Sequence, residues 1–211
     1  MLRFSLLVLA LLAALRPAAA QDRAGDFDFY VLALSWSPTY CETDGRDDRQ
    51  QCRRGADHAF VVHGLWPQYE RGYPEYCPVA DDWVPESLAD EMADLMPSRR
   101  LVFRQWRKHG TCSGLNQTAY FDTVRDAFER VAMPRPLQDP DRDIRVSAQA
   151  LEGAFVSANR GLRRDMMSVR CASGLVEEVR ICLTKRLDFR ACPEVDRRGC
   201  QQGDLVMPAP G

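Results

Sequence analysis

The sequence predicts one α+β domain in which an antiparallel β-sheet packs against several helices and disulfides staple the fold. Two strand-like segments come first, four helix-like segments follow and further strand-like segments come last, and there is no repeat, low-complexity tract or interdomain linker. After a leader of 20 residues, about 190 residues remain, which is enough for one domain with its own core. Eight cysteines, an even number, are typical of a disulfide framework.

The first 20 residues have the pattern of a secretory signal peptide. Arg3 precedes an apolar run over 4–15, and Pro17 and three alanines follow it. A membrane anchor needs about 20 apolar residues, and this run is too short. We therefore expect cleavage before Gln21, a domain over 21–211, and a secreted or periplasmic protein without a membrane span.

In an exported chain, the cysteines are expected to form disulfides, although the sequence alone leaves their pairing open. No two of them are two to four residues apart, so the spacing of a zinc site is missing. The cysteines are Cys41, Cys52, Cys77, Cys112, Cys171, Cys182, Cys192 and Cys200.

Aromatic and β-branched residues predict a strand over 27–36 and a second over 59–66, which stops at Pro67. Between them, 42–55 is charged and reads as a solvated loop. Alternation over 175–183 predicts two or three antiparallel strands in the cysteine-tied tail.

Helical spacing predicts four helices. Asn116 or Thr118 caps the third, and Ser147 caps the fourth, which ends near Gly161. The first three cover 86–96, 99–109 and 118–131.

The formal net charge is −2, and removal of residues 1–20 takes away two arginines and no acid. Proteins that coat nucleic acid need a basic surface, because their affinity comes from the release of counterions. Composition therefore excludes a coating protein and leaves room for an enzyme that holds nucleic acid briefly.

Two of the three histidines lie in dense polar and aromatic segments, His63 within Phe60 to Gln68 and His109 within Arg104 to Cys112. Gly64 follows His63 at the expected end of a strand, so the ring of His63 is free to leave the sheet. A regular strand points His58 to the opposite face, so we interpret it as structural or exposed.

A helix over 101–109 gathers four polar side chains on one side, because successive residues are turned by about 100°. These are Arg104, Gln105, Lys108 and His109, whereas Trp106 falls on the buried side. Gly110 is expected to end the helix.

Two imidazoles and a lysine suit the attack of a ribose 2′-hydroxyl on its own phosphate. One imidazole takes the 2′ proton and the other protonates the leaving 5′ oxygen. Lys108 would stabilise the charge on the five-coordinate phosphorus, and no metal or other cofactor is needed.

Both segments resemble the catalytic segments of the ribonuclease T2 family. Phe60 to Pro67 matches F-x-x-H-G-L-W-P, and Trp106 with 108–112 matches most of H-E-W-x-K-H-G-T-C. The resemblance implies an endoribonuclease of low base specificity on single-stranded RNA, with a 2′,3′-cyclic phosphate and then a 3′-phosphate as products. We expect it to act as a monomer.

Carried over by position, the family's roles make His109 the general base and His63 the general acid. Trp66 and Tyr73 resemble residues that stack on the base, and Gln68 lies near its edge. The resemblance also implies the disulfides 41–52, 77–112, 171–200 and 182–192.

The second segment departs from the family at its start, where Arg104 and Gln105 replace His and Glu. Arg104 can still bind phosphate, because its guanidinium is permanently charged and forked. Gln105 carries no charge, so the pKa of His109 is expected to be lower than in the family. We expect an active enzyme with a changed pH profile.

Three alternatives stay open. The chain could be a weakened or inactive relative that binds RNA, or a cysteine hydrolase that uses Cys112 and His109. It could also hold zinc between His63 and His109, although no third ligand is recognisable.

Overall fold

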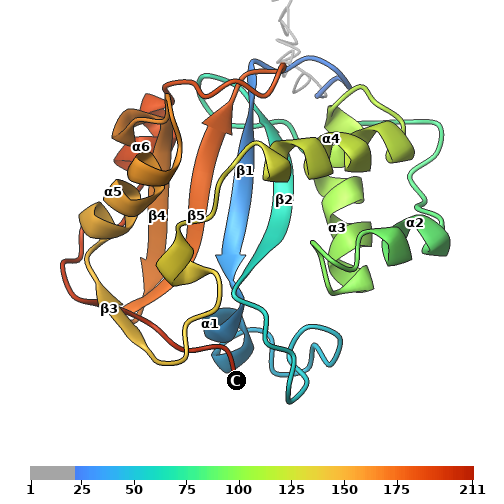
Figure 1. Ribbon diagram of the computed structural model, residues 1–211. Helices are drawn as coiled ribbons and strands as arrows, with labels where there is room; N and C mark the ends of the chain where they lie inside the picture. Colours follow the sequence, from blue (N-terminus) through green and yellow to red (C-terminus); the bar gives the residue numbers. More distant parts are fainter. Residues whose placement is uncertain (1–21) are drawn as a thin grey trace, which may run out of the picture.

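A six-stranded sheet runs through the middle of the molecule in the computed structural model, which describes residues 22–211 (Figure 1). The expected signal peptide therefore lies outside the described residues. The strands are β1 (Phe29–Trp36), β2 (Phe60–Gln68), β3 (Ile144–Val146), β4 (Met167–Ala172), β5 (Leu175–Leu183) and β6 (Leu205–Met207).

Two groups of helices flank the sheet in the view of Figure 1, with α2, α3 and α4 beside β2 and with α5 and α6 beside β4. The α-helices among the described residues are α1 (Ser37–Glu42), α2 (Glu86–Glu91), α3 (Arg99–Lys108), α4 (Gln117–Glu129), α5 (Ala148–Ala158) and α6 (Pro193–Arg197). Short 3₁₀ turns cover Gly110–Cys112, Arg135–Leu137 and Arg164–Met166. The prediction of one α+β domain is confirmed.

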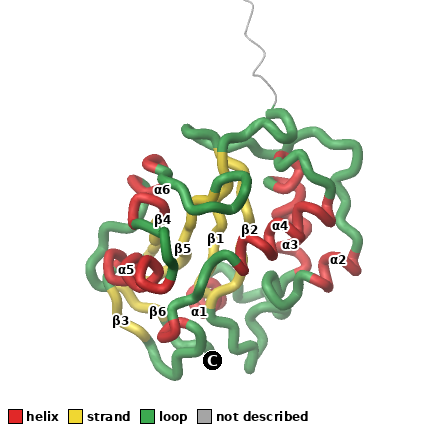
Figure 2. The backbone as a smooth tube through the Cα atoms, turned by 45° about the horizontal axis from the view of Figure 1, so that its top comes forward, coloured by secondary structure: helices red, strands yellow, loops and turns green. Residues whose placement is uncertain are grey.

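The strand order is β2-β1-β5-β6-β3, and β4 also pairs with β5. All pairs are antiparallel except β5 with β6, which meet in parallel at Leu175 and Val206. The sheet is therefore mixed, and the predicted antiparallel sheet is corrected by this one parallel contact. Pairing with β1 covers β5 only from Glu178 onward, so the edge at Leu175 is free for β6. Figure 2 shows β6 beside β3 at this end of the sheet.

One face of the sheet forms the main core. Leu32, Leu34, Leu65 and Ile181 are fully buried there together with side chains of the helices, among them Trp106 of α3. Each fully buried leucine or isoleucine contributes about 1.5–3 kcal/mol relative to an exposed one. The opposite face carries a small second cluster of Phe29, Val31, Cys182 and Cys192, which leaves much of that face for a site.

Several predicted boundaries change for identifiable reasons. Strand β2 continues through Pro67, which an edge strand tolerates because the missing N–H points away from β1. Helix α2 ends five residues before the predicted end at residue 96, since the chain turns so that the Leu95 carbonyl accepts the N–H of Val62. The short helix α1, with Pro38 in its first turn, was not predicted.

Helices α3, α4 and α5 agree with the patterns that predicted them to within three residues, whereas α6 was not predicted. Asn116 caps α4 by accepting the N–H of Ala119, and Ser147 caps α5 by accepting the N–H of Ala150. Thr118 is not the cap.

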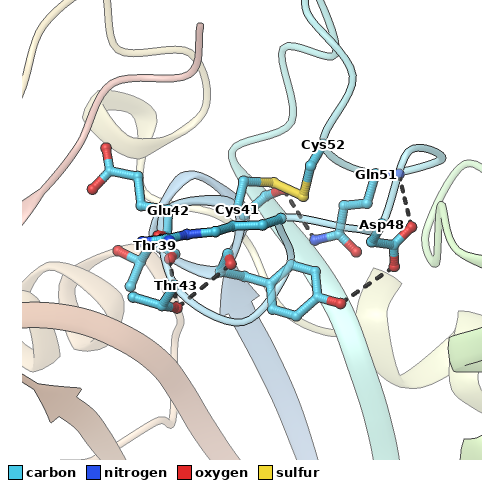
Figure 3. Close-up of a disulfide and its surroundings, with 10 residues drawn as sticks. Thr39, Cys41, Glu42, Thr43, Asp48, Gln51 and Cys52 are labelled. Carbon is cyan, nitrogen blue, oxygen red and sulfur yellow. Dashed lines mark hydrogen bonds between the residues drawn. A yellow bond between two sulfur atoms is a disulfide. The ribbon is translucent and has the colours of Figure 1, made fainter.

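Four disulfides join Cys41 to Cys52, Cys77 to Cys112, Cys171 to Cys200 and Cys182 to Cys192. These are the pairs that the family resemblance implies. Figure 3 shows the first bridge, which closes the charged loop after α1. Inside this loop the backbone N–H of Gln51 donates to Asp48, and the Gln51 side chain donates to Ser37. Among residues 22–211, no helix has the length and apolar character needed to cross a membrane.

Candidate active site

His63 occupies a β-bulge in the middle of β2. Ala33 of β1 pairs with Gly64 and Leu34 pairs with Val62, so His63 has no partner on β1. Val62 and Leu65 are both fully buried although they are three residues apart, which regular alternation does not allow. The extra residue in β2 lets Val62 and Leu65 face the same core, and it turns the side chain of His63 in a new direction. The prediction that His63 leaves the sheet at a strand end is therefore wrong: the bulge turns it out from within the strand.

The sheet face that carries the second cluster is hollowed into a cleft of about 750 Å³. Side chains from β2, α3, β5 and α6 line it, together with the loop that follows β2. All eight residues predicted for catalysis or substrate binding are among the lining residues: His63, Trp66, Gln68, Tyr73, Arg104, Gln105, Lys108 and His109.

His109 follows the last residue of α3 and is 6% exposed. Its ring is stacked on Trp66, with 5.3 Å between the ring centroids. The Nδ1 atom is buried and has no hydrogen-bond partner among the described residues. Burial, followed by the positive charges of Lys108, His63 and Arg180, lowers the pKa of His109 from 6.5 to about 3. The neutral ring is therefore the stable form in the folded protein.

Gln105 is buried and accepts a hydrogen bond from the indole Nε1 of Trp66 at 2.7 Å. A β-carbon at position 64 would overlap both the Gln105 amide and the Trp66 indole. Gly64 is thus required by the close approach of α3 to β2, and the hydrogen bond fixes the indole beside His109.

Gly110 has a packing role of the same kind. It begins a 3₁₀ turn, is not in the left-handed region, and therefore does not end α3 in the predicted way. A β-carbon there would overlap the ring of Trp106 and touch Tyr120. The absent side chain lets the segment after His109 lie against the core.

Lys108 and Tyr73 lie at the rim of the cleft. The Lys108 Nζ atom is 3.3 Å from a carboxylate oxygen of Glu75 and 5.8 Å from the centre of the Tyr73 ring. Tyr73 is 44% exposed, Arg104 is also exposed, and Gln68 donates to the carbonyl of Pro67.

Two residues of β5 near the site were not predicted from the sequence: Arg180, which lines the cleft, and Glu178, which lines an adjoining hollow beside His63. Glu178 is 6% exposed and contacts the Nδ1 atom of His63, and it also accepts from the Arg180 Nε atom at 2.8 Å. The guanidinium of Arg180 lies 4.9 Å from the centre of the Trp66 ring. Alternation over 175–183 identified the strand, but only the register of the sheet shows that these charges face His63.

Comparison with known proteins identifies the family of this chain. A model of the ribonuclease T2 family matches residues 27–192. The chain belongs to the ribonuclease T2 family. A ribonuclease of Aeromonas hydrophila is 36% identical over 202 residues, which are 89% of this chain and 88% of that protein. The chain is therefore a T2-type endoribonuclease.

Two solved structures share the fold of this T2 family member. An RNase-related protein from Calystegia sepium has a TM-score of 0.68 at 25% identity and covers 88% of this chain and 98% of its own. RNase NT in complex with 5′-AMP has a TM-score of 0.64 at 25% identity and covers 87% of this chain and 99% of its own.

Two sequence-based interpretations are settled by position. Cys112 is bonded to Cys77, so the alternative of a Cys112 nucleophile is wrong. His58 is half-buried and lies outside the lining of the cleft, as expected for a residue without a role there.

The buried His109 should make the ribonuclease sensitive to acid. The unfolded chain binds a proton on this ring below pH 6.5, whereas the folded chain does so only near pH 3. The part of the free energy of unfolding that depends on a neutral His109 is therefore fully present above pH 6.5. It should fall by an amount on the order of a few kcal/mol as the pH decreases toward 3.

Urea unfolding of the wild type and of His109→Gln at several pH values checks this expectation. The variant should lose less stability than the wild type between about pH 7 and pH 4, and His58→Gln should behave like the wild type. Equal acid sensitivity in the wild type and His109→Gln would contradict it.

Proposed function

We propose that this T2-type endoribonuclease cleaves single-stranded RNA through a 2′,3′-cyclic phosphate, which it then opens to a 3′-phosphate, without a metal or other cofactor. The observation that carries the proposal is one cleft with two imidazoles in opposite environments. His109 is buried near positive charges, and His63 is hydrogen-bonded to the carboxylate of Glu178.

His109 is suited to act as the general base. A base must be unprotonated before the reaction, and burial keeps this ring neutral down to low pH. Its Nδ1 atom is enclosed in protein, so Nε2 is the nitrogen that would take the proton of the ribose 2′-hydroxyl.

His63 is suited to act as the general acid. Its Nδ1 atom contacts Glu178, so its Nε2 atom is available to the leaving group. As the bond from O2′ to phosphorus forms and the bond from phosphorus to O5′ breaks, His63 gives its proton to O5′. Opening of the cyclic product by water reverses the two roles.

The cations of α3 would stabilise the phosphate as it gains negative charge. Lys108 and Arg104 both line the cleft beside His109. Binding of phosphate would compete with Glu75 for the Lys108 ammonium. This ion pair at the rim is weak, because its two side chains are 36% and 43% exposed.

Tyr73 offers an accessible aromatic face for stacking on a base, because it is 44% exposed. Trp66 is held between Gln105, His109 and Arg180, so we assign it chiefly to the shape of the base site, with Gln68 at its edge. RNase NT was solved with 5′-AMP, which supports a nucleotide site in this fold. Since stacking accepts every base, we propose low base specificity.

We also propose an exported monomer. The pattern of residues 1–20 supports export, and disulfides persist in oxidising compartments. The rival, an inactive relative that binds RNA, draws support from Gln105 in place of the family's Glu. Intact RNA after incubation with the purified chain from pH 4 to 8 would favour that rival. Cleavage that occurs without EDTA and is lost when EDTA is added would favour the zinc alternative.

The two histidines should respond differently to the leaving group. His63→Ala and His109→Ala should each lose on the order of 10²–10⁴ in rate on a dinucleotide. A nucleoside 3′-(4-nitrophenyl phosphate) releases nitrophenolate, which needs no proton. On this substrate His63→Ala should recover most of its activity, and His109→Ala should not. A loss below tenfold on the dinucleotide, or recovery by His109→Ala alone, would contradict the assignment.

Gln105→Glu should change the pH profile in a defined direction. A carboxylate beside His109 stabilises the imidazolium and raises the pKa of that ring, so the acid limb of kcat/KM should move to higher pH. Gln68→Glu adds the same charge elsewhere in the cleft and should move the limb less. An acid limb that stays in place in Gln105→Glu would show that Gln105 does not set the pH range.

A further inference from the structure

Glu178 is a buried carboxylate whose two oxygens are both occupied. Oε1 contacts Nδ1 of His63 and lies 3.4 Å from the hydroxyl of Ser35, which donates to it. Oε2 accepts the Nε–H of Arg180 at 2.8 Å. The carboxylate thus joins three adjacent strands, β2, β1 and β5.

The sheet register explains why these groups meet. Ser35 pairs with Glu178 and Ala33 pairs with Arg180, so two charged residues of β5, two apart, stand on the cleft face. Ala33 and Gly64 are adjacent across β1 and β2, and their small size leaves room above them for the Arg180 guanidinium and the Trp66 indole. The bulge in β2 then brings His63 to the carboxylate.

This carboxylate is ionised. Burial raises the pKa of Glu178, but the hydrogen bond with His63 and the charge of Arg180 outweigh it and bring the pKa to about 2. An ionised carboxylate only accepts hydrogen bonds, so the proton of the contact belongs to Nδ1 of His63. The same contact therefore selects the tautomer of His63 and directs its Nε2 atom away from Glu178.

We propose that Glu178, fixed by Arg180, is the positioning residue that orients His63 toward the leaving 5′ oxygen. Glu178 acts through His63 and does not touch the substrate. The inference rests on the proposed function, since it assumes that His63 is the general acid.

The surroundings offer no competing partner at the same reach. Two small hollows adjoin His63, and Arg104 and His109 face it from α3 and the turn after it. Besides Glu178 and Arg180, the other titratable groups that line these hollows are Tyr40, Asp44, Asp48, Arg100, Arg170 and Glu177. Among the described residues, only Glu178 makes a hydrogen bond to the His63 ring.

The test compares Glu178→Gln with Glu178→Asp and uses Glu177→Gln as the matched control, which removes the same charge one residue away. On a dinucleotide, Glu178→Gln should lower kcat by about 10–100-fold with KM within about threefold, as for loss of an orienting partner. Glu178→Asp should be intermediate, and Glu177→Gln should match the wild type.

The nitrophenyl substrate distinguishes a loss of general-acid catalysis from a general disturbance of the site, because its leaving group needs no proton. Glu178→Gln should act on it within about threefold of the wild type, and in a His63→Ala background it should add no further loss on the dinucleotide. An equal loss on both substrates would mean a merely structural role and would overturn the inference. If Glu178→Gln does not fold, Glu178→Asp carries the same comparison, because its shorter side chain withdraws from Nδ1 but keeps the charge.

The outcomes also distinguish the two proposals. Full activity of His63→Ala on the dinucleotide would contradict the proposed function itself. If His63→Ala is inactive but Glu178→Gln has the same kcat as Glu177→Gln, the proposed function stands and only the role of Glu178 is contradicted.

Discussion

The bulge at His63 is the constraint on which the site depends. Strand β2 must bury both Val62 and Leu65 in the main core while it pairs with β1 along its length, and one extra residue in β2 makes this possible. That residue is the histidine. The displaced ring meets Glu178 across the sheet, and the residues after the bulge place Gly64 and Trp66 against α3.

Helix α3 completes the site because it can approach the sheet closely at two glycines. Gly64 admits the hydrogen bond between Trp66 and Gln105, and Gly110 lets the chain after His109 lie on Trp106. The disulfide between Cys77 and Cys112 ties the end of this segment to the loop that follows β2. His109 is thereby buried beside the indole. Its burial and the nearby cations lower its pKa below that of an exposed histidine.

The local parts of this arrangement were predictable. The position of Arg104, Gln105, Lys108 and His109 on one side of a helix follows from helical rotation alone, and all four line the cleft. The bulge was not predictable, since it depends on which residues of β2 the core accepts. Glu178 was missed because it lies 115 residues from His63 and meets it only through strand register. The parallel contact of β6 likewise depends on where β1 ends.

The central claim is that two protein side chains move protons while the ribose 2′-hydroxyl attacks its own phosphate. The most direct measurement is ³¹P NMR of a defined dinucleotide during incubation with the purified chain in EDTA. A 2′,3′-cyclic phosphate should appear first and decay to a 3′-phosphate, and the 2′-deoxy dinucleotide should stay intact. Direct formation of a 5′-phosphate, or cleavage of the deoxy substrate, would contradict the account.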